Sequence, residues 1–217
     1  MTREAVIVAG SRTAVGKSKR GTTRNWRSDE MAAEVIKDLL RKAPALDPAE
    51  IDDVIIGCAM PEGAQGLNFA RTIALRAGLP VETPGQTVNR FCSSGLQTIA
   101  MAAERIIANG ADVIIAGGAE TMSLVPMTGF RVNPNPYMVE NMPEVYMGMG
   151  LTAERVADEY EVTRQAQDEF AVRSHHKAAA AYERNAFKDE IVPLEIEEVT
   201  AGPNGPQRAT SLFDRDE

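Results

Sequence analysis

Short β-branched runs alternate with longer helical patterns in the first half of the chain, and this alternation limits the possible folds more than any other feature. The strand-like runs are Ala5 to Ala9, Val54 to Gly57, Gln86 to Phe91 and Val113 to Ala116. Because parallel strands need long crossover connections, the helices that join them cover the faces of the sheet. The pattern therefore predicts an α/β domain with a largely parallel sheet and helices on both faces.

Three helices are predicted between these strands. The first covers Asp29 to Ala43, where Ser28 suits a cap and Pro44 marks the end. The second covers Asn68 to Ala77 and closes at a glycine. The third is apolar on most sides, which predicts a buried helix; its apolar residues are Leu96, Ile99, Ala100, Met101, Ala102, Ala103, Ile106 and Ile107.

A cysteine lies where the third strand-like run passes into the third helix. The segment Asn89 to Gln97 contains Cys92, two serines and a glycine, which suit a tight turn. Backbone N–H groups at a helix start favour thiolate over thiol, and thiolate is the nucleophilic form. Cys92 is therefore a candidate nucleophile at the carboxyl end of a strand. The alternative is a small buried hydrophobe without reactivity.

The segment Asn89 to Gln97 resembles the nucleophile motif of the thiolase family, and three more segments match in the family's order. These are Ala5 to Thr13, Gly117 to Ser123 and Met149 to Glu154. The resemblance implies a thiolase-like doubly wound mixed sheet with helices on both faces, one of the two similar halves of the family fold. The family's second half, with a Gly-His-Pro segment and a second reactive cysteine, has no counterpart before Glu217.

This resemblance implies two regions. Residues 1–121 are expected to form the N-terminal α/β domain, and residues 122–217 a loop region that covers the substrate, truncated before the second half. Six methionines lie between positions 122 and 149, interspersed with prolines that prevent long regular elements. This composition fits a cover over an acyl-coenzyme A tunnel. It fits ordinary loop packing or a subunit contact equally well. The resemblance favours the cover. Met149 matches a position that lines the coenzyme A site, whereas Gly148 stands where some members have histidine.

The resemblance also implies an activity. Cys92 would take the acyl group of a 3-ketoacyl-coenzyme A, with its own backbone N–H as one oxyanion donor. Coenzyme A would then collect the shortened acyl group, as in fatty-acid β-oxidation. The family's activating histidine, acid/base cysteine and second oxyanion donor belong to the other half, so residues 1–217 alone are expected to be inactive. A biosynthetic thiolase, a condensing enzyme of the same superfamily, and a non-catalytic fragment that binds acyl-coenzyme A or a partner remain alternatives.

No metal or prosthetic group is expected, and coenzyme A is a substrate. His175 and His176 are adjacent on a predicted helix, so they point about 100 degrees apart and cannot share one ion. Gly16-Lys17-Ser18 lacks the glycine spacing of a phosphate-binding loop. Gly148 to Ala153 satisfies the loose dinucleotide fingerprint and precedes a predicted helix, but no strand-like run comes before it, so a dinucleotide site is not expected.

Composition narrows the remaining classes. With 44% apolar residues the chain has enough material for a sizeable core, and its net charge is −8. The excess of acidic groups outside the basic first 27 residues argues against nucleic-acid binding. No run is long enough for a membrane span and no signal peptide is evident, so a cytoplasmic protein with reduced Cys58 and Cys92 is expected. The resemblance further implies a homodimer or homotetramer.

The patterns in the last third of the chain predict two helices and one strand. The helical patterns run through Ala153 to Tyr160 and Ala166 to Tyr182, and residues 191–196 are strand-like. Residues 202–206 predict a turn. The tail from Ser211 shows no closing element.

Overall fold

The computed structural model of the 217-residue chain describes residues 3–203 and 205–217. By their contacts these residues form two compact units. One contains the chain up to Phe130 together with Glu190–Glu217, and the other is Arg131–Asp189.

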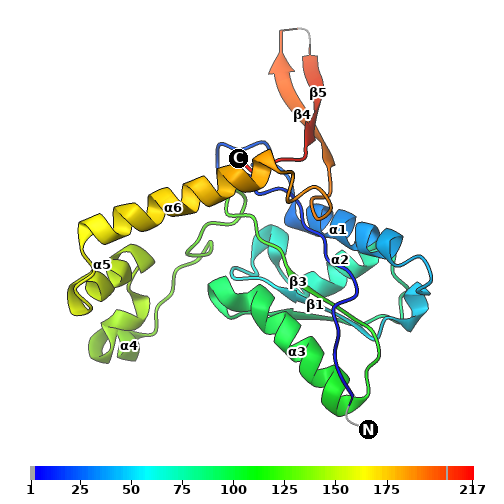
Figure 1. Cartoon of the computed structure of the whole chain (residues 1–217), viewed down its shortest axis with the longest axis horizontal. Coiled ribbons are helices and arrows are strands. Elements are labelled where there is room, and N and C mark those ends of the chain that lie inside the picture. Colours follow the sequence, from blue (N-terminus) through cyan, green and yellow to red (C-terminus); the bar gives the residue numbers. More distant parts are fainter. Residues whose placement is uncertain (1–2, 204) are drawn as a thin grey trace. The chain divides into compact units, whose positions relative to one another are not determined.

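A three-stranded parallel sheet lies at the centre of the first unit. Its strands are β1 (Asp53–Gly57), β2 (Gly85–Val88) and β3 (Ile114–Gly118), in the order β2-β1-β3. Helices α1 and α2 cover one face and α3 covers the other (Figure 1). The predicted α/β fold class, with helices on both faces, is confirmed. The antiparallel pairing of the chain lies in a separate hairpin.

The core forms between β1 and the two helices α1 (Ser28–Lys42) and α2 (Phe69–Ala77). Every residue of β1 is buried, as expected for a central parallel strand. Phe69 and Ile73 of α2 pack in the same cluster. Helix α2 closes at Gly78, as predicted, and this glycine has the left-handed conformation; Asn68, expected as the first helix residue, is instead its N-cap.

The predicted first strand, Ala5 to Ala9, is wrong. This run joins no sheet, and Ile7 is 84% exposed. Nearby, Arg12 and Ile191 form an isolated parallel bridge outside the two sheets. A β-branched run becomes a strand only where another strand offers its edge, and among the described residues none does so for Ala5 to Ala9.

Two boundaries also differ from the prediction. Strand β2 ends at Val88 rather than Phe91, because Phe91 has a φ of 45°, which no strand accommodates. Ser28 is the first residue of α1 rather than its cap. Its hydroxyl instead donates to Oε1 of Gln65 at 3.0 Å.

Helix α3 (Ser94–Asn109) was expected to be buried, and only one side of it is. Ser94, Thr98 and Ala102 face the sheet and are buried. The opposite side carries the larger apolar residues and is exposed: Leu96, Ile99 and Ile107. Small side chains lie inward because they let the helix approach the strands closely, which leaves the predicted apolar face outward.

The expected boundary between residues 121 and 122 does not match the division by contacts. Strands β4 (Leu194–Gly202) and β5 (Gly205–Phe213) form an antiparallel hairpin that belongs to the first unit. Leu194, Ile196 and Phe213 pack with Ala14 in a second apolar cluster, which anchors the hairpin to the N-terminal segment. The predicted turn at 202–206 is thus the hairpin's connection, although Asn204 lies outside the described residues.

The second unit is helical. It contains α4 (Pro136–Asn141), the 3-10 turn η4 (Pro143–Tyr146), α5 (Met149–Glu159) and α6 (Arg164–Glu183). Prolines begin α4 and η4, which are short, as the composition predicts. In the part of the chain that the structure describes, no helix is both long and apolar enough to span a bilayer.

Candidate active site

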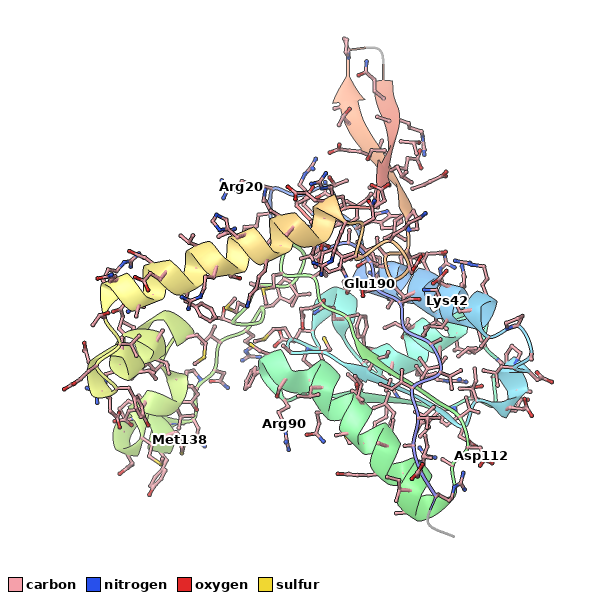
Figure 2. The ribbon with its side chains drawn as sticks, viewed as in Figure 1. Arg20, Lys42, Arg90, Asp112, Met138 and Glu190 are labelled. Carbon is pink, nitrogen blue, oxygen red and sulfur yellow. The ribbon has the colours of Figure 1, made fainter. Side chains whose placement is uncertain are left out.

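The candidate nucleophile lies in a single 3-10 turn between β2 and α3. This turn, η3, covers Phe91–Ser93, and the Cys92 side chain within it is exposed. Arg90, just before the turn, lies at the start of α3, whereas Asp112 lies near its other end (Figure 2). The structure therefore places the thiol at the helix start and on the surface, as predicted.

Side-chain hydrogen bonds fix the shape of this turn. The Phe91 N–H donates to Oδ1 of Asn89 at 2.8 Å, and the Arg90 N–H donates to Oγ of Ser94 at 2.8 Å. Ser94 Oγ in turn donates to the Phe91 carbonyl at 2.6 Å. These bonds retain Phe91 at a positive φ, a conformation that non-glycine residues rarely adopt.

Glycines allow α3 to begin directly against the strand ends. A Cβ added to Gly57 at the end of β1 would lie 2.5 Å from the Ser94 carbonyl carbon and 2.7 Å from the Gly95 nitrogen. On the neighbouring strand, Thr98 of α3 donates to the Gly117 carbonyl at 2.9 Å. The backbone of α3 therefore lies directly against β1, and the Thr98 side chain joins the helix to β3, which fixes where Cys92 stands relative to the sheet.

A polar network lies behind the turn, at the carboxyl ends of β1 and β3. Glu120 accepts the Ala59 N–H at 2.6 Å and a short hydrogen bond from the Gln65 amide. Gln65 is fully buried and also donates to the Met60 carbonyl at 2.8 Å. The network ties the loop after β1 to the end of β3.

The Cys92 backbone N–H has no hydrogen-bond acceptor among the described residues. Its neighbour, the Ser93 N–H, donates to the Arg90 carbonyl at 3.1 Å. An exposed thiol and an uncommitted N–H on the same residue are the two groups that a covalent acyl transfer needs from a nucleophile.

The second cysteine differs from Cys92 in its burial. Cys58 follows β1 and is 1% exposed. Burial, with a contribution from the nearby Glu120 carboxylate, raises the pKa of Cys58 to about 12. Cys58 is thus a core residue and a thiol that resists ionisation.

The other residues considered from sequence lie in the second unit. Met149 is the first residue of α5 and is 68% exposed. Its assignment to the coenzyme A site stays a prediction. His175 and His176 are exposed on α6.

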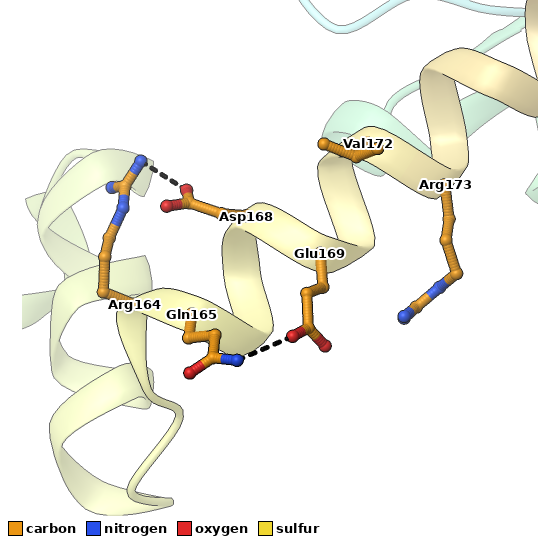
Figure 3. Close-up of a pocket in the computed structure, with 6 residues that line it drawn as sticks. All are labelled: Arg164, Gln165, Asp168, Glu169, Val172 and Arg173. Carbon is orange, nitrogen blue, oxygen red and sulfur yellow. Dashed lines mark hydrogen bonds and ion pairs between the residues drawn. The ribbon is translucent and has the colours of Figure 1, made fainter.

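An open depression of about 760 Å³ runs along α6 in the second unit (Figure 3). Within it, Arg164 pairs with Asp168 at 2.7 Å and the Gln165 amide donates to Glu169 at 2.9 Å. Its lining comes from this one helix: Arg164, Gln165, Asp168, Glu169, Val172 and Arg173. Pairs of this kind between successive turns are typical of a solvated helix face.

Sequence reasoning missed three residues that shape the site. Asn89 carried a signal, because asparagine often binds a backbone N–H two residues later in a turn. Glu120 stands at a strand end in the segment Gly117 to Ser123. Gln65 had no signal, because a buried polar side chain in a loop shows no periodicity.

Comparisons with known proteins agree with this geometry. The family model described as "Thiolase, N-terminal domain" matches residues 5–204. A 3-ketoacyl-CoA thiolase of Bacillus subtilis is 51% identical over 216 residues, which are 99% of this chain and 55% of that protein. A 3-ketoacyl-CoA thiolase of Saccharophagus degradans is 45% identical over 201 residues, covering 93% of this chain and 51% of that protein.

A solved structure agrees as well. The acetyl-CoA acetyltransferase of Bacillus anthracis superposes with a TM-score of 0.83 and 35% identity, over 100% of this chain and 55% of that chain. The chain therefore spans about half the length of the relatives that it matches. Given the family match and the identity along nearly its whole length, the chain belongs to the thiolase family and corresponds to the N-terminal part of its relatives.

Proposed function

We propose that this chain supplies the nucleophile of a 3-ketoacyl-coenzyme A thiolase, an acyltransferase, and that Cys92 is its acyl acceptor. The exposed thiol of Cys92, at the start of α3 and beside its own uncommitted N–H, is the observation that carries the proposal. The names of the relatives support the substrate class.

The chemistry follows from these two groups. The Cys92 sulfur attacks the 3-keto carbon, and the Cys92 N–H stabilises the negative oxygen that forms. The bond between the second and third carbons then breaks, its electron pair goes to acetyl-coenzyme A as an enolate, and the enolate takes a proton. Coenzyme A removes the shortened acyl group from the sulfur in a second transfer.

Residues 1–217 are proposed to lack the means for rapid turnover. Cys58 is buried, and neither histidine is assigned a role, so no described residue is assigned as the base or acid of the reaction. A role in β-oxidation, a cytoplasmic location and assembly into homodimers or homotetramers also remain proposals.

Site-resolved alkylation tests the nucleophile. When the folded chain reacts with iodoacetamide, peptide mapping should show much faster modification at Cys92 than at Cys58. Equal rates at the two cysteines of the folded chain would contradict the proposal.

A further inference from the structure

Asn89 connects the turn that carries Cys92 to the loop after β1. Its Oδ1 accepts the Phe91 N–H at 2.8 Å, and its Nδ2 donates to the Ala59 carbonyl at 3.0 Å. One exposed side chain thus joins two segments that are thirty residues apart in the sequence.

The bond to Phe91 lies where the backbone most needs support. Phe91 has a φ of 45°, and a side chain in this left-handed region is unfavourable unless its surroundings hold it there. The peptide on the far side of Phe91 leads directly to Cys92. The conformation of Phe91 therefore sets the direction in which the thiol and the N–H of Cys92 point.

The anchor at the other end is rigid. The Ala59 peptide accepts from Asn89 through its carbonyl and donates to Glu120 at 2.6 Å through its N–H. Glu120 is bound in turn by the fully buried Gln65. A continuous series of hydrogen bonds therefore runs from the interior of the first unit to the turn.

We infer that Asn89 is a positioning residue for the nucleophile: it holds Phe91 in its left-handed conformation and ties the Cys92 turn to the Ala59 peptide. The inference rests on the proposed role of Cys92 and adds a second residue to that site. Asn89 is exposed, so its truncation leaves no cavity in the core, and the effect on the thiol is measurable in a folded chain.

Asn68 provides a matched control within the same chain. It is also exposed, it accepts the Arg71 N–H at 3.2 Å through Oδ1, and it donates to the Gly85 carbonyl at 2.8 Å through Nδ2. At the opposite end of β2, Asn68→Ala thus removes both of these kinds of hydrogen bond, together with the bond that Asn68 Oδ1 accepts from Thr87 Oγ1 at 3.2 Å. A general loosening of the fold would appear in both variants.

The test measures iodoacetamide alkylation of Cys92, with Cys58 in the same molecules as a monitor of unfolding. Asn89→Ala should slow Cys92 by roughly three- to tenfold, the factor that one hydrogen bond provides. Asn68→Ala should leave the Cys92 rate within about twofold of the parent. Cys58 should remain slow in both variants.

A second variant tests the backbone conformation itself. Glycine adopts a positive φ without penalty, so Asn89→Ala combined with Phe91→Gly should recover most of the lost rate. A parent rate in Asn89→Ala, an equal loss in Asn68→Ala, or no recovery in the double variant would each overturn the positioning role. If Cys92 of the parent chain reacts no faster than Cys58, the proposed function fails instead.

Discussion

Cys58 and Cys92 follow neighbouring strands of one sheet, yet their thiols have opposite surroundings. Cys58 is enclosed by the apolar cluster of β1, α1 and α2, where an ionised sulfur would lose its hydration. Cys92 stands on a turn with its side chain in solvent. Position in the fold, not residue type, therefore places one thiol in the core and the other on the surface.

The raised pKa of Cys58 predicts a loss of stability in alkali. Burial raises this pKa from its ordinary value of 9.0 to about 12, so the folded state keeps a proton that the unfolded state releases. The contribution of the protonated Cys58 thiol to the free energy of unfolding is complete below pH 9.0 and is lost as the pH rises toward 12. Over this range the free energy of unfolding falls by at most about 1.4 kcal/mol per pH unit, the value for the release of one proton.

Urea unfolding of the parent and of Cys58→Ala, with reductant present, measures this effect. The free energy of unfolding of the parent should decline more steeply with pH than that of the variant. The difference between the two isolates Cys58 from the lysines and tyrosines that titrate in the same range. Parallel declines would show that Cys58 does not resist ionisation.

At the scale of elements, local patterns predicted those whose partners lie near in the sequence. The strand β1, the three helices around the sheet and the end of α2 at Gly78 all followed from periodicity and helix-end signals. Ala5 to Ala9 failed because pairing depends on a distant edge. Strand β5 was missed because every one of its residues except Phe213 is exposed, which leaves almost no apolar pattern.

In the candidate site too, local features were predictable from the sequence and contacts between distant segments were not. Cys92 was predictable because a strand end, a turn and a helix start meet at one residue. Gly57 and Glu120 were not, because their roles arise from contacts between segments that only the fold brings together. Which side of α3 faces the sheet was also unpredictable. Ser94, Thr98 and Ala102 face it because small side chains allow close packing, not because they are apolar.

The close approach of α3 to β1 predicts a large effect of a single methyl group. Gly57→Ala would place a Cβ 2.5 Å from the backbone of Ser94, where no side-chain rotation relieves the overlap. Moving the helix should cost about 2 kcal/mol or more of unfolding free energy, as in other overpacked cores. Urea denaturation measures this change.

Gly117→Ala on β3 is the control for this substitution. A Cβ at Gly117 meets no atom within 4 Å, so this variant should lie within about 0.5 kcal/mol of the parent. If both variants are equally stable, α3 is not held against β1 by backbone contact, and the placement of Cys92 would need another explanation.

For the whole molecule, the central fact is that the chain spans about half of its relatives and exposes apolar surface on the unit that carries the site. The side chains of Val6, Ile7 and Val8 are 73%, 84% and 81% exposed, and one side of α3 is exposed to solvent. Patches of this kind mark surfaces that associate with other protein. The described residues build the proposed nucleophile, whereas efficient turnover is proposed to need groups that they do not supply.

Acyl transfer to Cys92 tests the account most directly. The chain is incubated with acetoacetyl-coenzyme A, a 3-ketoacyl thioester, and its peptides are mapped by mass spectrometry, with Cys92→Ser as the control variant. The account predicts a slowly formed, stoichiometric acetyl group on Cys92, none on Cys58, and none at position 92 of the control. Acetylation at other residues without Cys92, or the absence of acetyl on Cys92 after prolonged incubation, would contradict it.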